Sequence, residues 1–166
     1  YLDTRLPEEL EHYRAAVTVT EEIVRRALSA EVITPGRTTV GDVRRALYDM
    51  LWAAGVRTWF QPDLRVQRAG EENATSRGFL AVAREGVVIQ PGDLVHIDFG
   101  ISYMGFDTDW QKMAYVLKPG ETKAPAGLQA ALRNTNTLQD ALMLRHARPG
   151  LTGGAVFTAT MAEMEQ

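Results

Sequence analysis

The chain has 166 residues, a formal net charge of -3 at pH 7, 45% hydrophobic and 23% charged residues, and no cysteine. These values describe one globular domain or part of one and exclude a disordered tail or a fibrous repeat. The slightly acidic charge argues against a nucleic-acid-binding surface, and the missing cysteines exclude disulfides and zinc–thiolate sites. Apolar runs of only a few residues argue against a membrane span, and without a signal-peptide pattern we expect a cytoplasmic location.

Helices are predicted near both ends of the sequence. Residues 7–31 start with a proline and two glutamates, which suit a first helical turn, and carry apolar residues at helical spacing. A second helix is expected to start at Thr39, where an aspartate three positions later completes a capping box, and to end near Gly55. Residues 126–147 and 152–166 predict two more helices, the last capped by its first residue, a threonine.

Strands and loops are predicted between these helices. Aromatic and aliphatic residues in 56–66 predict a strand pair interrupted by a proline. The polar, glycine-flanked stretch 69–78 predicts a loop. After a Pro-Gly turn, residues 94–102 and 107–117 predict two strands joined as a hairpin.

This hairpin is the most informative part of the sequence. A turn at Met104-Gly105 sets a register in which Asp98 faces Gln111. Because side chains alternate between the faces of a strand, Asp98 and Asp109 then lie on one face as diagonal neighbours. Diagonal neighbours are about 7–8 Å apart and closer at the side-chain tips, so the two carboxylates can converge on one point.

Carboxylates at this separation repel each other unless a proton or a cation lies between them. Aspartate is also unfavourable in strands, and such conflicts with local propensity tend to mark function. A divalent metal suits Asp98 and Asp109, because Mn, Zn, Co and Mg accept carboxylate oxygens. The alternative is an edge hairpin whose aspartate face is simply hydrated, and spacing alone does not separate the two. His96 lies on the same face, and we expect a hydrogen-bonded structural histidine there.

These residues resemble the metal-site signature of the pita-bread metallopeptidases, which include methionine aminopeptidases, Xaa-Pro aminopeptidases, prolidases and the related creatinases. The resemblance rests on Asp98 in a His-Ile-Asp-Phe-Gly segment, on the turn at Gly105, and on Asp109 eleven residues after Asp98. Residues 89–100 and 34–42 resemble the Xaa-Pro aminopeptidase and prolidase branch. The resemblance extends over nearly the whole chain, and the hairpin is its most specific part.

The resemblance implies an α+β fold, the first half of a pita-bread (creatinase/aminopeptidase) domain with helices over an antiparallel sheet. It implies two divalent metal ions, foremost manganese with zinc or cobalt as alternatives, held by five protein ligands. The first two ligands map onto Asp98 and Asp109. The implied activity is that of an aminopeptidase or dipeptidase of Xaa-Pro type, in which a metal-activated water hydrolyses the N-terminal peptide bond of a peptide substrate.

The other three ligands of the family, one His and two Glu, belong to the second half of its fold and have no evident counterpart here. His146 lacks the glycine-rich setting of the ligand, and Glu163 and Glu165 read as ordinary helix residues. We therefore expect residues 1–166 to be an incomplete catalytic domain that is inactive alone. The first residue, Tyr1 instead of Met, also suggests a fragment or a processed product. Exposed apolar surface would be covered by a homodimer partner or by the missing second half.

A further departure concerns the loop before the hairpin. The family commonly places a substrate-binding His there, and residues 73–79 contain none. This favours either altered substrate handling or a non-catalytic peptide-binding pseudoenzyme on the same fold. A metal-independent enzyme of creatinase type is a third possibility, but it normally lacks the aspartate pair, so Asp98 and Asp109 argue against it.

Overall fold

The computed structural model describes residues 5–71 and 84–165. The chain forms two units, residues 1–121 and residues 122–166. Within the described ranges, no helix is both long enough and apolar enough to cross a membrane.

The first unit begins with helices α1 (Pro7–Ala27) and α2 (Val40–Ala53). The prediction that the first helix continues to residue 31 is wrong. The helix ends early because of Ser29. Its hydroxyl donates to the carbonyl of Arg26 and accepts from the backbone N–H of Glu31, and these two bonds stabilise a tight turn in place of further helix. The predicted capping box of α2 is confirmed. The backbone N–H of Thr39 donates to the Asp42 carboxylate, and the backbone N–H of Asp42 donates to the Thr39 hydroxyl.

Within residues 5–71 and 84–165, six strands form two antiparallel three-stranded sheets, ordered β2-β3-β6 and β1-β4-β5. The strand pair predicted in residues 56–66 is wrong. The two strands there belong to different sheets, because β1 pairs with β4 and β2 pairs with β3. The strand bounds are β1 Arg57–Thr58, β2 Asp63–Gln67, β3 Leu94–Phe99, β4 Ile101–Tyr103, β5 Phe106–Asp107 and β6 Trp110–Tyr115.

The predicted hairpin is present in the predicted register, with Asp98 opposite Gln111 and Tyr103 opposite Phe106. Its two long strands are, however, interrupted. Strand β3 ends before Gly100 and continues as β4, while β5 ends before Thr108 and β6 starts two residues later. The interruption transfers the hairpin from one sheet to the other.

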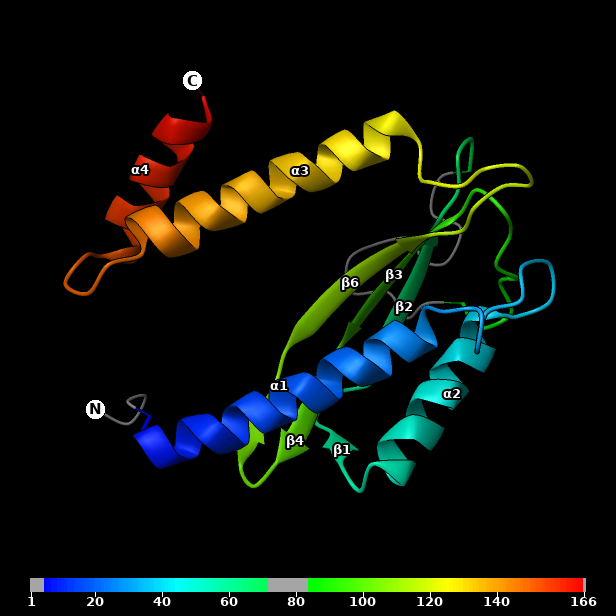
Figure 1. The fold of residues 1–166 in the computed structure, drawn as a ribbon, viewed down its shortest axis with the longest axis horizontal. Coiled ribbons are helices and arrows are strands. Elements are labelled where there is room, and N and C mark those ends of the chain that lie inside the picture. Colours follow the sequence, from blue (N-terminus) through cyan, green and yellow to red (C-terminus); the bar gives the residue numbers. More distant parts are fainter. Residues whose placement is uncertain (1–4, 72–83, 166) are drawn as a thin grey trace. The chain divides into compact units, whose positions relative to one another are not determined.

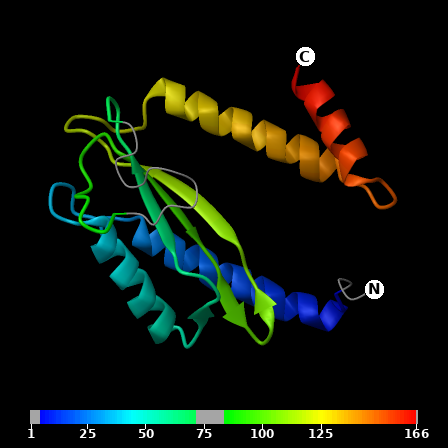
Figure 2. The ribbon, with the colours of Figure 1, turned by 180° about the vertical axis from the view of Figure 1, so that it is seen from behind.

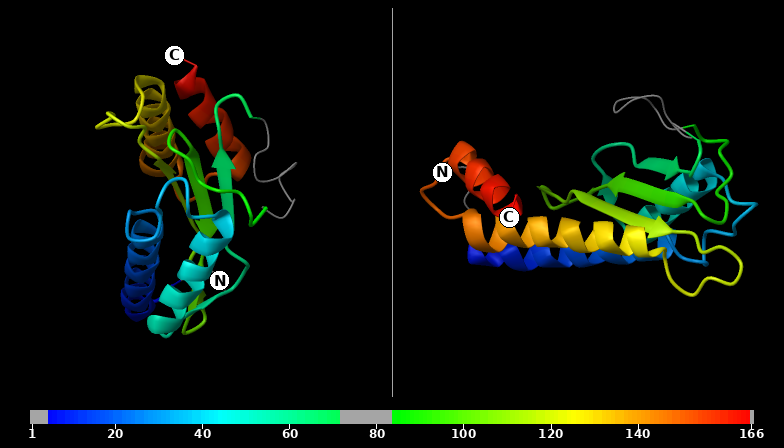
Figure 3. Two further views of the ribbon diagram at one scale, coloured as in Figure 1. Left: turned by 90° about the vertical axis from the view of Figure 1, so that its right-hand side faces the viewer. Right: turned by 90° about the horizontal axis from the view of Figure 1, so that it is seen from above.

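Alternation along β3 sets the layers of the first unit. Val95, Ile97 and Phe99 are fully buried, whereas the residues between them are only partly buried. The buried face joins one hydrophobic core with residues of α1 and α2. Both helices cover this face in Figure 1, the strands lie in front of them in the reverse view of Figure 2, and Figure 3 shows the same layers from the side and from above. Helices over an antiparallel sheet were predicted, and the structure confirms them.

The second unit contains helix α3 (Ala126–Asp140), a π-helical segment η1 (Ala141–His146) and helix α4 (Gly153–Met164). The helix predicted over 126–147 is confirmed, although its last turn is π-helical. The hydroxyl of Thr152 accepts from the N–H of Ala155 at 3.2 Å, which confirms the predicted cap. His146 contacts Glu163, with Nε2 and Oε2 2.6 Å apart, and so ties η1 to α4.

A buried ion pair connects the end of β2 to the turn before β3. Asp93 is fully buried, and the Arg68 guanidinium binds both of its carboxylate oxygens, at 2.8 and 2.9 Å. Asp93 also accepts from the backbone N–H of Gln90, and Arg68 donates to the carbonyl of Val88. One bidentate pair therefore fixes the backbone on both sides of residues 72–83.

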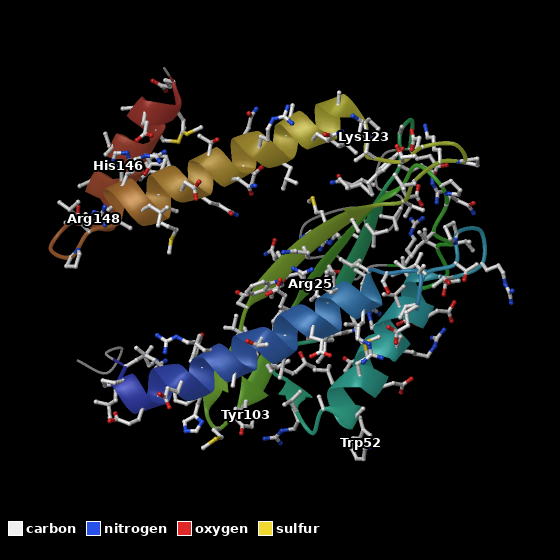
Figure 4. The ribbon with its side chains drawn as sticks, viewed as in Figure 1. Arg25, Trp52, Tyr103, Lys123, His146 and Arg148 are labelled. Atoms are coloured by element: carbon white, nitrogen blue, oxygen red, sulfur yellow. The ribbon has the colours of Figure 1, made fainter. Side chains whose placement is uncertain are left out.

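We expect Arg68→Met to lower the free energy of unfolding by about 3–5 kcal/mol, because it leaves the Asp93 carboxylate buried without its cation. Urea titration followed by circular dichroism measures the change. The matched control is Arg25→Met on α1, whose exposed pair with Glu21 spans 2.8 Å (Figure 4). It should change the free energy of unfolding far less, because water and salt screen an exposed ion pair. Equal effects of the two substitutions would contradict a special role for the buried pair.

Candidate metal centre on the hairpin

The sheet face opposite the core carries polar side chains in register across three strands. Asp98 on β3 lies between Asp63 on β2 and Gln111 on β6. In the next row, Arg65 on β2 faces His96. This polar face follows directly from the pleat, because every second residue of β3 is taken by the core.

Asp98 has one carboxylate oxygen with a partner and one without. Its Oδ2 accepts from the side-chain amide of Gln111 at 3.2 Å. Its Oδ1 is buried and has no hydrogen-bond partner among the residues the structure describes. A buried acceptor without a donor is unfavourable, so this oxygen is suited to a cation.

Both polar atoms of the Gln111 side-chain amide form hydrogen bonds. Its Nε2 donates to Asp98, and its Oε1 lies 3.2 Å from Nε2 of His96. Because an amide oxygen only accepts, His96 donates from a protonated Nε2. His96 is therefore hydrogen-bonded within the site, which fits the structural role expected from the sequence. Gln111 was not predicted as a site residue, although its position opposite Asp98 was the available signal.

The surroundings of Asp98 disfavour its ionised form. Burial is the main cause that raises the pKa of Asp98 above its ordinary value, and the charge of Asp109 is the next. Asp63 also raises this pKa, while His96 and Arg65 lower it. The charge of Asp109 therefore acts on Asp98. A bound cation would reverse the balance.

Asp63 is an acidic residue of this face that the sequence analysis did not single out. Its Oδ2 lies 2.5 Å from Nε of Arg65, two residues along the same strand. A carboxylate held by a guanidinium is largely neutralised. Asp63 still raises the pKa of Asp98, but its own carboxylate is paired with Arg65, so it is a poor candidate for a metal ligand.

The remaining predicted residues fall outside the centre. Trp110, which pairs with the buried Phe99, packs against the core. Glu163 lies in helix α4, where Arg145 and His146 both bind its carboxylate. Residues 73–79, the loop without a histidine, lie outside the described residues. Within residues 5–71 and 84–165, no three or more His, Cys, Asp or Glu side chains are grouped to hold a metal ion.

The model of metallopeptidase family M24 matches residues 11–166 of the sequence. The chain belongs to this family. No curated protein matches the M24 chain significantly.

Solved structures confirm the pita-bread fold of this M24 chain. It is similar to an X-Pro aminopeptidase from Thermotoga maritima, with a TM-score of 0.73 and 16% identity over 97% of this chain and 42% of that one. It is also similar to a prolidase from Pyrococcus furiosus, with a TM-score of 0.71 and 20% identity over 97% of this chain and 43% of that one. A prolidase from Thermococcus sibiricus is similar as well, with a TM-score of 0.73 and 15% identity over 98% of this chain and 41% of that one. The M24 chain thus spans less than half the length of these structures.

Membership of a metallopeptidase family implies divalent metal ions, and the donor set fits them in part. Asp98 offers an unpartnered, buried carboxylate oxygen, which is the donor type that hard divalent cations prefer. Asp109 adds a second carboxylate from the same hairpin. These two carboxylates are the residues of the hairpin that could hold such an ion.

We expect Asp98→Asn to raise the stability of the metal-free chain at pH 7. Because the pKa of Asp98 in the folded chain is above its ordinary value of 3.8, the fold favours the protonated form. That contribution is complete at pH values below 3.8 and is lost as the pH rises through the higher folded pKa. Asparagine stays neutral, so its advantage should shrink as the pH falls toward 3.

Urea titrations at pH 7 and near pH 3 measure this difference. Asp49→Asn, at an exposed position on α2, is the control and should change stability little at either pH. A lower stability of Asp98→Asn at pH 7 would show that the ionised carboxylate is favoured by the fold, contrary to the electrostatics of this face.

Proposed function

We propose that residues 1–166 form the first half of a catalytic domain of Xaa-Pro aminopeptidase or prolidase type, and that Asp98 and Asp109 are two of its metal ligands. The observation that carries the proposal is the buried Oδ1 of Asp98, which has no partner among the described residues, in a hairpin where the charge of Asp109 also raises the pKa of Asp98. Membership of family M24 and the similarity to solved aminopeptidases and prolidases support the reaction class.

In this proposal Asp98 and Asp109 act as metal ligands and not as a general acid or base. Asp98 and Asp109 hold the cations, and Gln111 fixes the rotation of the Asp98 carboxylate through its 3.2 Å hydrogen bond. When bound, divalent ions in such a centre lower the pKa of water and polarise the carbonyl of a peptide substrate. We take manganese as the metal, with zinc or cobalt as alternatives, and two ions as the number.

The remaining ligands, one His and two Glu, would come from a second half of the domain. The length of the similar structures supports this arrangement, because this chain covers 42% of the Thermotoga protein. Exposed apolar side chains in the second unit also support a further covering surface. Leu132, Leu144 and Phe157 are each more than 60% exposed. A second half of the domain, or a second copy of the chain, would bury them.

We expect this chain to bind Mn²⁺ weakly and the same chain extended by its second half to bind tightly. Two carboxylates leave most of the coordination sphere to water, whereas five ligands displace much of it. Isothermal titration calorimetry of both forms measures the difference. Absence of binding by both forms would contradict the metal centre and favour a peptide-binding protein without catalytic activity.

We also expect Asp109→Asn to abolish metal-dependent hydrolysis of an Xaa-Pro peptide by the extended form while leaving its unfolding midpoint nearly unchanged, since Asp109 is exposed. The matched control is Asp107→Asn, because Asp107 is an exposed aspartate two residues away in the same hairpin. It should retain the activity. Turnover by Asp109→Asn equal to that of the unmodified protein would refute the ligand assignment.

A further inference from the structure

The interruption of the hairpin has a specific cause at Thr108. In the register of the hairpin, Thr108 faces Ile101, and its N–H donates to the Ile101 carbonyl at 2.9 Å. The return bond does not go to the Thr108 carbonyl. The N–H of Ile101 donates instead to the Thr108 hydroxyl at 3.0 Å. A side-chain oxygen has thus replaced a backbone oxygen in the ladder, and the Thr108 carbonyl is free to turn away.

The Thr108 hydroxyl also forms a hydrogen bond to helix α1, and the donor of that bond can be assigned. Thr20 is fully buried, and its hydroxyl lies 2.9 Å from that of Thr108. Thr20 donates its single hydroxyl proton to the carbonyl of Ala16 at 2.8 Å. Thr108 must therefore donate to Thr20. The buried chain runs from the Ile101 N–H through both threonine hydroxyls to α1.

The displaced carbonyl of Thr108 has a partner of its own. Nε1 of Trp59, in the segment between β1 and β2, donates to it at 2.7 Å. The neighbouring residue across the hairpin is Gly100, where a Cβ atom would lie 1.8 Å from the Thr108 oxygen and 2.6 Å from the Trp59 nitrogen. No side chain fits there. Gly100 therefore provides the space into which the carbonyl turns.

We propose that Thr20 and Trp59 are positioning residues for Asp109, and that they act through Thr108. This inference rests on the proposed role of Asp109 as a metal ligand. The Thr108 carbonyl belongs to the same planar peptide group as the N–H of Asp109, so a bond that fixes one fixes the orientation of the other. Thr20 holds the side chain of Thr108, and Trp59 holds its carbonyl. The backbone entering Asp109 is thus fixed from two separate elements.

Asp109 needs such support because it is exposed, so burial does not hold it. A metal ligand must lie within about 0.5 Å of its working position. Tyr13 adds a further contact one residue upstream, where its hydroxyl donates to the Asp107 carbonyl at 2.7 Å. Contacts of Tyr13 and Thr20 on α1 and the hydrogen bond of Trp59 therefore converge on the two residues before Asp109.

The test compares Trp59→Phe, which removes the N–H donor and keeps an aromatic ring, with Trp52→Phe, which makes the same change elsewhere. Trp52 is 87% exposed and lies at the end of α2 (Figure 4), so its substitution is a matched control. Residual dipolar couplings of the Asp109 N–H report the orientation of the peptide group without any metal. Trp59→Phe should shift these couplings, and Trp52→Phe should not.

The second readout is Mn²⁺ affinity, measured from the paramagnetic broadening of the hairpin amide resonances. Loss of a supporting hydrogen bond costs about 10–100-fold in metal affinity, and we expect about tenfold for Trp59→Phe. Thr108→Val should weaken binding similarly, and Thr108→Ser should restore it, because serine keeps the hydroxyl. A general loss of stability would not be rescued in this way.

Unchanged Asp109 couplings in Trp59→Phe would overturn the inference, as would an unchanged Mn²⁺ affinity beside shifted couplings. If the unmodified chain shows no broadening near Asp98 and Asp109, the proposed metal centre fails and the role assigned to Thr20 and Trp59 fails with it. The couplings distinguish the two failures, because they report the Asp109 backbone whether or not a metal binds. If Thr108→Val does not fold, Trp59→Phe still decides the question.

Discussion

The pleat of strand β3 is the constraint on which the rest of the first unit depends. Val95, Ile97 and Phe99 fill the core beneath α1 and α2, and this leaves His96 and Asp98 no position except the opposite face. A shift of one residue would exchange the two sets and bury a carboxylate among aliphatic side chains. The same hydrophobic burial that stabilises the sheet therefore also places the candidate metal centre.

The register could be predicted from the sequence because it follows from a short turn and a period of two. The interruption at Gly100 could not, because it depends on the Thr108 hydroxyl replacing a backbone carbonyl, and nothing in the local pattern distinguishes this threonine from any other in a strand. The separation of β1 from β2 into different sheets follows from that interruption, so it was missed too. The early end of α1 depends on a local bond of Ser29 that outweighs helical periodicity.

The candidate site was predicted in the same partial way. Asp98 and Asp109 could be selected because two carboxylates on one strand face conflict with the propensity of strands, and the structure places them within electrostatic influence of each other. Gln111 and Asp63 carry no such conflict in the sequence. Their importance appears only when three strands lie side by side, because cross-strand neighbours are set by register rather than by sequence distance.

The Arg68–Asp93 pair has a consequence for how the chain tolerates change. Arg68 binds Asp93 and the Val88 carbonyl, so the ends of the intervening stretch are fastened to each other independently of what lies between them. Lengthening a connection costs little free energy once its ends are fixed, since the entropy of closure grows only with the logarithm of its length. Changes in the length of this connection should therefore cost the hairpin little free energy, as long as they spare Glu85, which binds the buried Arg44.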